Sequence, residues 1–316
     1  MLATATFSLG GIGSVSADAS AQSTEPLEIE DVSVSLGGVT SNVGLARFVY
    51  QDGTMGFGVQ DWTMESGERS LSVGSAVVTA SDVSEETYAT LREGLVESFE
   101  GRTLTPLAVA IRESNLNPES EVQVELDSVE LDGELIADQV TAAGVAGSVV
   151  PEGTRALLED GGPTLEELAA LGTSEWDVLT IQRGDAEFTA NDVVMGLDGA
   201  TVVIAAPSGS ANVSGRSFEF SEMQMTITPP GTIPEEHIEF ASQVRESAAE
   251  GDLSLSSIAS AAEESGVTAE NTADAVESAQ FELSFAEITE DGETVVSNFA
   301  TSGTLAELLA ALQQRT

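Results

Sequence analysis

The chain reads Val122-Gln-Val-Glu-Leu126-Asp-Ser-Val129-Glu-Leu-Asp132-Gly133-Glu134 at the stretch that decides its fold. Apolar and polar residues alternate along it, which is typical of a β-strand with one buried face. Asp132-Gly133 then supplies two residues that tolerate positive φ in a tight hairpin turn. The same pattern recurs in Phe281-Glu-Leu-Ser-Phe285-Ala-Glu-Ile288-Thr-Glu-Asp291-Gly292-Glu293. Both stretches predict antiparallel β-hairpins.

Three further matches occur in the same order along the chain. These pairs are Gly67–Leu71 with Ser214–Phe218, Ser84–Glu86 with Pro234–Glu236, and Pro163–Ala170 with Gly303–Ala310. Matches that keep their order over such a distance indicate an internal duplication. We therefore predict two diverged copies of one unit, over residues 27–172 and 176–316, preceded by an apolar segment over residues 1–22.

Each copy is predicted to combine strands with helices. Leu27-Glu-Ile29-Glu-Asp-Val32-Ser-Val34 alternates with period two, and Asp52-Gly53 and Ser66-Gly67 mark turns between later strands. A helix with apolar residues at helical spacing follows Ser84 as N-cap, and another begins at Thr105-Pro106. The predicted fold class is α+β: two tandem diverged copies of an antiparallel sheet with amphipathic helices packed on one side.

The excess of acidic over basic residues indicates a high-salt environment. Asp and Glu number 54 against 10 basic residues, all of them arginine, and the formal net charge is −44. Such self-repulsion is tolerable where molar salt shortens the screening length to about 3 Å, so we expect an extreme halophile, in the simplest case a haloarchaeon. The apolar content of 41% indicates a folded core and not disorder. This charge argues against nucleic acid and anionic membranes as partners, and solvent cations are expected to bind diffusely.

The first residues predict export. The apolar stretch over residues 1–22 ends in small residues suited to signal cleavage, and it resembles the hydrophobic part of a twin-arginine signal. No later segment reaches the 18 or so apolar residues of a membrane helix. We therefore expect a mature chain without membrane insertion, located outside the cell or on its surface; a cytoplasmic location is the alternative. The chain has no cysteine, which excludes disulfides and thiolate chemistry.

The residues offer little chemistry. The single histidine, His237, follows Glu235 and Glu236, and helix residues one or two apart point in different directions, so these residues do not form a metal-ligand set. Glu85 and Glu86 occupy the matching position of the first copy, and acids in a first helical turn favour the helix dipole. We predict no catalytic, cofactor-binding or metal-binding residues.

Three other residues are candidates for specific contacts. Arg69 and Arg216 recur at equivalent places, and each is predicted either to form a structural ion pair that fixes strand to helix or to contact an anion. Asn212 begins an Asn-x-Ser sequon, which is a glycosylation site if the protein is exported.

These observations favour a non-catalytic, secreted or cell-surface binding or structural protein. In it a sheet wrapped by an amphipathic helix would enclose an apolar ligand, or the duplicated domains would pack into a surface layer. A carboxylate-dependent extracellular hydrolase is the first alternative, because it needs neither cysteine nor histidine. A subunit of an extracellular filament or virion is the second, since tandem repeats suit lattice contacts.

Overall fold

The computed structural model describes the twelve strands, the helices and most of the connections between them. The described residues are 26–36, 39–67, 69–101, 105–114, 116–149, 173–198, 201–229, 239–240, 242–244, 246–247, 254–267 and 278–308. The apolar segment over residues 1–22, which we predicted to be a signal, lies outside them.

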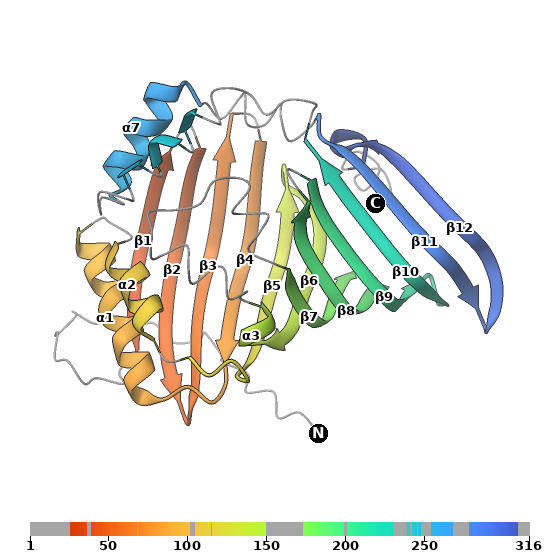
Figure 1. The fold of residues 1–316 in the computed structure, drawn as a ribbon, viewed down its shortest axis with the longest axis horizontal. Coiled ribbons are helices and arrows are strands. Elements are labelled where there is room, and N and C mark those ends of the chain that lie inside the picture. The colour runs from red at the N-terminus through yellow and green to blue at the C-terminus, as the bar shows by residue number, and fades with distance from the viewer. Residues whose placement is uncertain are drawn as a thin grey trace.

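All twelve strands belong to one antiparallel sheet in which every strand lies beside its neighbours in sequence (Figure 1). The strands are β1 (Leu27–Leu36), β2 (Val39–Gln51), β3 (Thr54–Ser66), β4 (Arg69–Ala80), β5 (Glu121–Leu131), β6 (Glu134–Val145), β7 (Ser174–Arg183), β8 (Ala186–Asp198), β9 (Thr201–Val213), β10 (Arg216–Thr228), β11 (Gln280–Glu290) and β12 (Glu293–Thr304).

The helices with defined bounds are α1 (Glu85–Gly101), α2 (Thr105–Glu113), the single turn α3 (Ala146–Val149) and α7 (Leu255–Ser265). Residues 239–240, 242–244, 246–247 and 305–308 are also helical. The predicted N-cap of α1 is confirmed, because the Thr87 amide donates to Ser84 Oγ over 3.1 Å. Ser254 caps α7 in the same way, and Gly266 ends that helix in the left-handed region at φ 76°.

The predicted α+β fold class is wrong. The two halves do not form separate sheets with their own helices, because residues 139–143 of β6 pair with residues 178–182 of β7 and join all strands into one sheet. The strands run for 10–13 residues, about twice the usual length, and the helices cover only parts of the sheet. The protein is therefore mostly antiparallel β-sheet.

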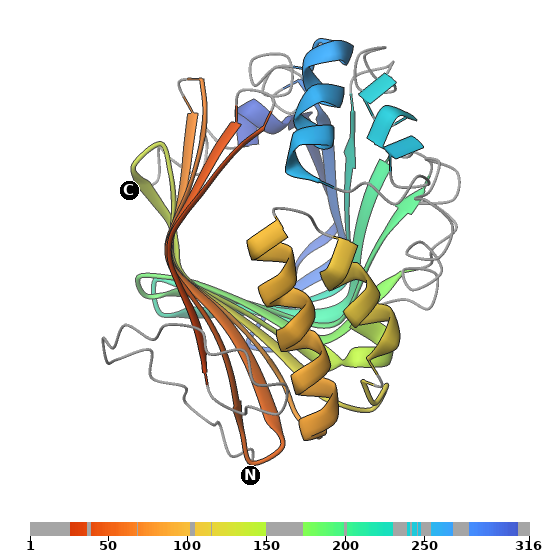
Figure 2. The same ribbon diagram turned by 90° about the vertical axis from the view of Figure 1, so that its left-hand side faces the viewer.

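One face of the sheet, here called the inner face, is the face on which α1 packs. Tyr88 of α1 contacts Leu27 and Phe48, which lie opposite each other on β1 and β2. Figure 2 shows α1 and α2 inside the curve of the sheet. From Phe48, directly paired residues carry this face across the next strands as far as β8, through Phe57, Val78, Val124, Ala142, Leu179 and Ala190.

In seven strands the alternation of faces shifts by one residue near the middle. Residues three apart normally point to opposite faces of a strand. In seven strands, however, two apolar residues three apart pack into one cluster: Val73/Ala76, Leu126/Val129, Ala137/Val140, Trp176/Leu179, Ala190/Val193, Phe220/Met223 and Phe285/Ile288. We call the two residues between each such pair the crease. The strands bend near their middle in Figure 2.

Left-handed residues lie near the middle of six strands. Asp31, Asp61, Ser128, Asp192, Glu222 and Asn298, on β1, β3, β5, β8, β10 and β12, have φ between 50° and 56°. Those of β5, β8 and β10 fall within the crease, and we extend the name to the equivalent positions of β1, β3 and β12, whereas β4, β6, β7 and β11 shift without a left-handed residue. Within each half the left-handed residue thus falls on alternate strands. Asp and Asn tolerate this region better than other side chains.

Glycine lies beside these left-handed residues in the first half. The ladders place Gly44 between Asp31 and Asp61, and Gly74 between Asp61 and Ser128. A Cβ on Gly44 would lie 3.2 Å from Asp61 Cβ, and one on Gly74 would lie 3.1 Å from Ser128 Cβ. These glycines therefore make room for the left-handed neighbours.

The crease also corrects our interpretation of Leu27–Val34 as one unbroken period-two alternation. The apolar residues fall at 27 and 29 and then at 32 and 34, with the left-handed Asp31 between the two sets. In β3, Trp62 and Met64 likewise continue the pattern of Phe57 and Val59 out of phase, on either side of the left-handed Asp61.

The two halves share one order of elements. Helices follow the fourth strand of each half, α1 and α2 after β4 and α7 after β10, and two strands complete each half. The fifth and sixth strands also share a register shift, between Val129 and Glu130 in one half and between Ile288 and Thr289 in the other. These features support the duplication, whereas the division into two domains stays a prediction.

The left-handed backbone conformation of Asp61 can be tested by substitution. We expect Asp61→Val to lower the free energy of unfolding by about 1–2 kcal/mol, because a β-branched side chain is poorly accommodated at positive φ. Asp61→Gly, the control, removes that cost and should lower stability far less. Urea unfolding in multimolar KCl, followed by the fluorescence of neighbouring Trp62, measures both. Equal losses in the two variants would contradict a left-handed residue here.

Strands β8 and β10 pack closely against Gly209 of β9, and this packing can be tested by substitution. A Cβ on Gly209 of β9 would lie 2.2 Å from the Thr189 carbonyl oxygen and 2.1 Å from Phe220 Cζ. We therefore expect Gly209→Ala to destabilise the fold by about 1–3 kcal/mol or more. Gly74→Ala is the matched control. It gains the same unfolded-state entropy benefit, and its nearest contacts would be milder, at 3.1 Å from Ser128 Cβ and 3.4 Å from the Asp127 carbonyl oxygen, so its effect should stay within about 1 kcal/mol.

Candidate functional site

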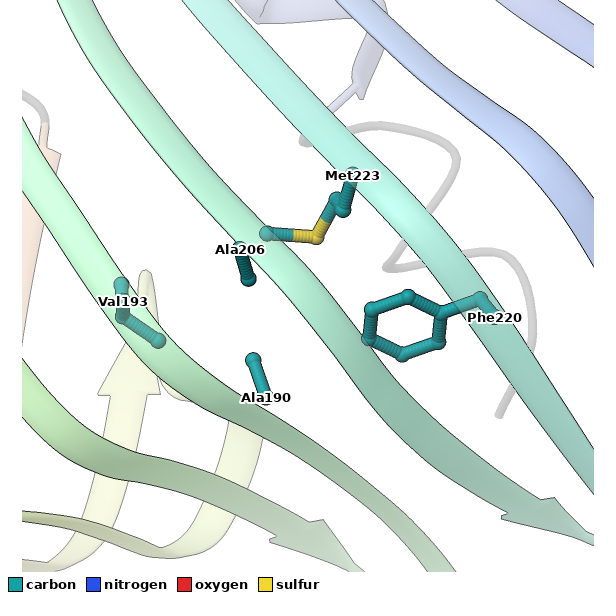
Figure 3. Packing of buried hydrophobic residues seen from close by; sticks show 5 residues of the cluster. All are labelled: Ala190, Val193, Ala206, Phe220 and Met223. Atoms are coloured by element: carbon teal, nitrogen blue, oxygen red, sulfur yellow. The ribbon is translucent and has the colours of Figure 1, made fainter.

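The inner face of the second half is built from apolar side chains on successive strands. Figure 3 shows Ala190 and Val193 of β8, Ala206 of β9, and Phe220 and Met223 of β10 gathered on one side of the sheet. All five are buried. Their packing supplies the main hydrophobic cluster of this half.

An aromatic series extends this cluster toward the last strand. Phe188 stacks on Phe220 with ring centroids 5.2 Å apart, and Phe220 meets Phe285 edge to face at 5.2 Å. Phe285 in turn lies 6.0 Å from Phe299. These are favourable aromatic geometries. The series thus carries an apolar surface from β8 to the edge strand β12.

An open groove of about 720 Å³ lies at the crease of β9 to β12. Its apolar lining includes Met223, Phe285 and Phe299, whereas Glu222 and Asn298 contribute polar groups. Glu222 is the one carboxylate among its described lining residues, so this groove offers no carboxylate pair of the glycosidase type.

Large apolar side chains on the inner face remain partly exposed. Phe57 and Val78 pair across β3 and β4 with 36% and 41% of their surface exposed. Five others on this face have exposed fractions between 36% and 38%: Ile181, Leu197, Val202, Val296 and Phe299. An apolar surface left open over several strands indicates a binding face.

In the first half, α1 covers the part of the inner face over β1 and β2. Tyr88 is fully buried, stacks on Phe48 and Tyr50 at centroid distances of 4.7 and 5.2 Å, and donates its hydroxyl to the Phe48 carbonyl over 3.2 Å. Burial raises the pKa of Tyr88 above its usual value, because the phenolate would lose its hydration. Leu91, Leu95 and Val96 complete this contact.

The opposite, outer face is polar. Asp127 accepts hydrogen bonds from Ser75 over 2.8 Å and from Gln139 over 3.3 Å, and Glu125 accepts from the same glutamine over 2.6 Å. Arg47 pairs with Glu28 over 2.9 Å on β2 and β1. Polar cross-strand pairs of this kind stabilise a solvated sheet surface. The two faces therefore differ sharply in character.

Arg69 and Arg216 form the ion pairs that we predicted, but with strands and not with helices. Arg216 is bidentate to Glu290 of β11, with Nε–Oε1 at 2.7 Å and Nη2–Oε2 at 2.6 Å. Arg69 pairs with Asp132 in the β5–β6 turn, and Asp132 also accepts the Ser70 amide over 2.9 Å. Each arginine thus joins the fourth strand of its half to the end of the fifth, because those strands are adjacent in the sheet.

The other predicted residues are not brought together. Glu85 and Glu86 are exposed in the first turn of α1, as predicted. Asn212 is half-buried on β9 beside Ser217 of β10 and Glu187 of β8. The remaining candidates, Glu235, Glu236 and His237, lie outside the described residues.

Sequence reasoning missed the groove at the middle of β9 to β12, whose lining residues come from both faces of these strands. A usable signal was present in the three-residue apolar step of Phe285/Ile288 and its equivalents, which places both residues on one face. In the described part of the chain, no group of three or more His, Asp or Glu side chains is arranged to hold a metal ion. Among the described helices, none combines the length and hydropathy needed to span a bilayer.

Comparison with known proteins does not assign the chain to a family. No protein-family model, curated protein sequence or solved structure matches it. Functional inference therefore depends on the residues and their arrangement.

The Arg216–Glu290 pair predicts a change in acid stability. The hydrogen bond and charge of Arg216 lower the pKa of Glu290 from 4.5, so the pair contributes stability above that pH and loses it as the pH falls through the lowered value. We expect Arg216→Gln to return the Glu290 pKa toward its usual range and to flatten this acid dependence. Melting temperatures between pH 3 and 6 in multimolar KCl would measure it; an unchanged profile would contradict a contribution from the pair.

Proposed function

We propose that this protein binds an elongated apolar ligand on the inner face of its sheet, with the aromatic residues of β11 and β12 as the principal contact. The observation that carries the proposal is the row of partly exposed apolar side chains across the strands, which ends in the aromatic residues Phe285 and Phe299. Binding sites for apolar ligands are concave and mostly apolar with few polar groups.

The shape of the surface supports a long ligand. Trp176, Val193, Ala206, Met223, Phe285 and Phe299 lie at the same level of successive strands from β7 to β12. Five spacings of about 4.8 Å between strands make this row about 24 Å long. Val193, Ala206 and Met223 in this row are buried, so an acyl or isoprenoid chain lying across the strands would contact its partly exposed end at Phe285 and Phe299.

One polar group supports an amphiphilic ligand. The indole N–H of Trp176 is buried and has no hydrogen-bond acceptor among the described residues. A buried N–H without an acceptor costs about 1–3 kcal/mol. A ligand oxygen placed at that end of the row would satisfy it, while the apolar chain extends toward Phe299.

We propose that the protein works in a salt-rich medium, outside the cell or on its surface, and that it carries a ligand and catalyses no reaction. Its acidic residues keep the outside of the sheet hydrated at high salt, whereas the inner face stays apolar. This separation supports binding of water-insoluble molecules where electrostatic attraction is weak.

We expect Phe299→Glu to weaken binding of the neutral probe N-phenyl-1-naphthylamine at least tenfold, because a carboxylate would enter the apolar contact surface. Phe299 is 37% exposed, so the fold should tolerate the change. Val295→Glu is the matched control: it lies on the opposite face of the same strand with 48% exposure and should leave probe binding unchanged. Fluorescence titration in multimolar KCl measures both variants.

Mass spectrometry of an organic extract from the natively purified protein provides the direct test. A stoichiometric apolar molecule, depleted in the Phe299→Glu variant and retained in Val295→Glu, is the expected result. An empty wild-type protein that also fails to bind the probe would refute the proposal.

A further inference from the structure

The last strand, β12, is an open edge of the sheet. In the described part of the chain it forms a ladder only with β11. Residues Glu293 to Ser302 are all exposed, including Val295, Val296 and Phe299 at 48%, 38% and 37%. A long exposed edge with apolar side chains is a template for pairing with another strand.

The opposite edge differs. β1 carries the acids Glu28, Glu30 and Asp31, and α7 from the second half contacts it (Figure 1). Charges and covering elements are the usual means of protecting an edge strand from association. β12 has one charged residue, Glu293 at its start, and none from Thr294 to Thr304. The two edges are therefore not equivalent, and only β12 is suited to pairing.

We propose that β12 pairs antiparallel with β12 of a second copy, which makes a twofold dimer with a continuous sheet. The strand that pairs with β12 must have a crease of its own. Beyond the crease of β12, the side chains of a regular strand would point to the opposite face from the β12 side chains beside them. The second copy's β12 has the same three-residue step between Val296 and Phe299 and adds almost no like charge. This inference does not depend on a bound ligand.

The internal ladders predict the register of this dimer. β11 carries its three-residue step between Phe285 and Ile288, and β12 carries its step between Val296 and Phe299. In the ladder between them, the first residue of each step pairs with the second residue of the other step: Phe285 with Phe299, and Val296 with Ile288. The same rule pairs Val296 with Phe299 of the second copy. The twofold axis then lies between Ser297 and Asn298, Val295 faces Ala300 of the second copy on the outer face, and Glu293 faces Ser302. No two acids are opposed, so the pairing is free of direct repulsion.

Cysteine pairs test this register, since the chain contains no cysteine of its own. Directly opposed residues on antiparallel strands have Cα atoms about 4.5–5.5 Å apart, within the range of a disulfide. We expect the double variants Val295→Cys/Ala300→Cys and Val296→Cys/Phe299→Cys to form disulfide-linked dimers on oxidation. At least one should react fast, because neighbouring pairs alternate between narrow and wide geometry. Residues three or five apart on one strand are too distant to bridge each other.

Val295→Cys/Phe299→Cys is the matched control. It has the same number of cysteines on the same strand, but neither faces a cysteine in the proposed register, so we expect at least a tenfold slower cross-linking rate. Light scattering of the unmodified protein in multimolar KCl should give twice the chain mass of 32.6 kDa. A monomer at all concentrations, open-ended oligomers, or equally fast cross-linking of the control would overturn the proposal.

Discussion

The crease is the constraint on which the rest of the structure depends. A strand of 12 or 13 residues with strict alternation would form a gently twisted sheet with one uninterrupted apolar face. Here a left-handed residue such as Asp61 or Asn298 shifts the alternation by one position, so apolar residues before and after it stay on the same side. The sheet bends along this line and its inner face remains apolar throughout. Helix α1 packs on the bent sheet, and the groove and the aromatic series lie where its strands bend.

The acidic composition and the apolar inner face are both suited to high salt. A net charge of −44 is compatible with a compact fold when molar salt screens it, and the polar outer face has cross-strand partners such as Ser75 and Asp127. In the same medium, salt strengthens the burial of apolar surface and weakens charge attraction. Recognition by apolar contact and by strand pairing, as proposed for the inner face and for β12, suits these conditions better than recognition by charge.

Local features were predictable because each depends on a few neighbouring residues. The Ser84 cap, the start of α2 at Thr105 and the Asp132-Gly133 turn occur where the sequence placed them. The arginine pairs were predicted as ion pairs, but their partners were not, since Asp132 and Glu290 approach only when the fourth and fifth strands lie side by side. The fold class was wrong because the pairing of β6 with β7, which joins both halves into one sheet, depends on strands far apart in the chain.

The sequence by itself determined the acidic, lysine-free composition, the hairpin turns, the helix caps and the ordered similarity of the two halves, all of which are local or compositional properties. Only the tertiary structure decided that the halves share one sheet, because the β6–β7 ladder joins residues some 40 positions apart without a distinctive motif. It also decided which faces are covered. Tyr88 covers Leu27 and Phe48 in the first half, whereas Phe57 of the same half and Phe299 of the second stay partly exposed, because packing between distant elements sets the exposure of each side chain.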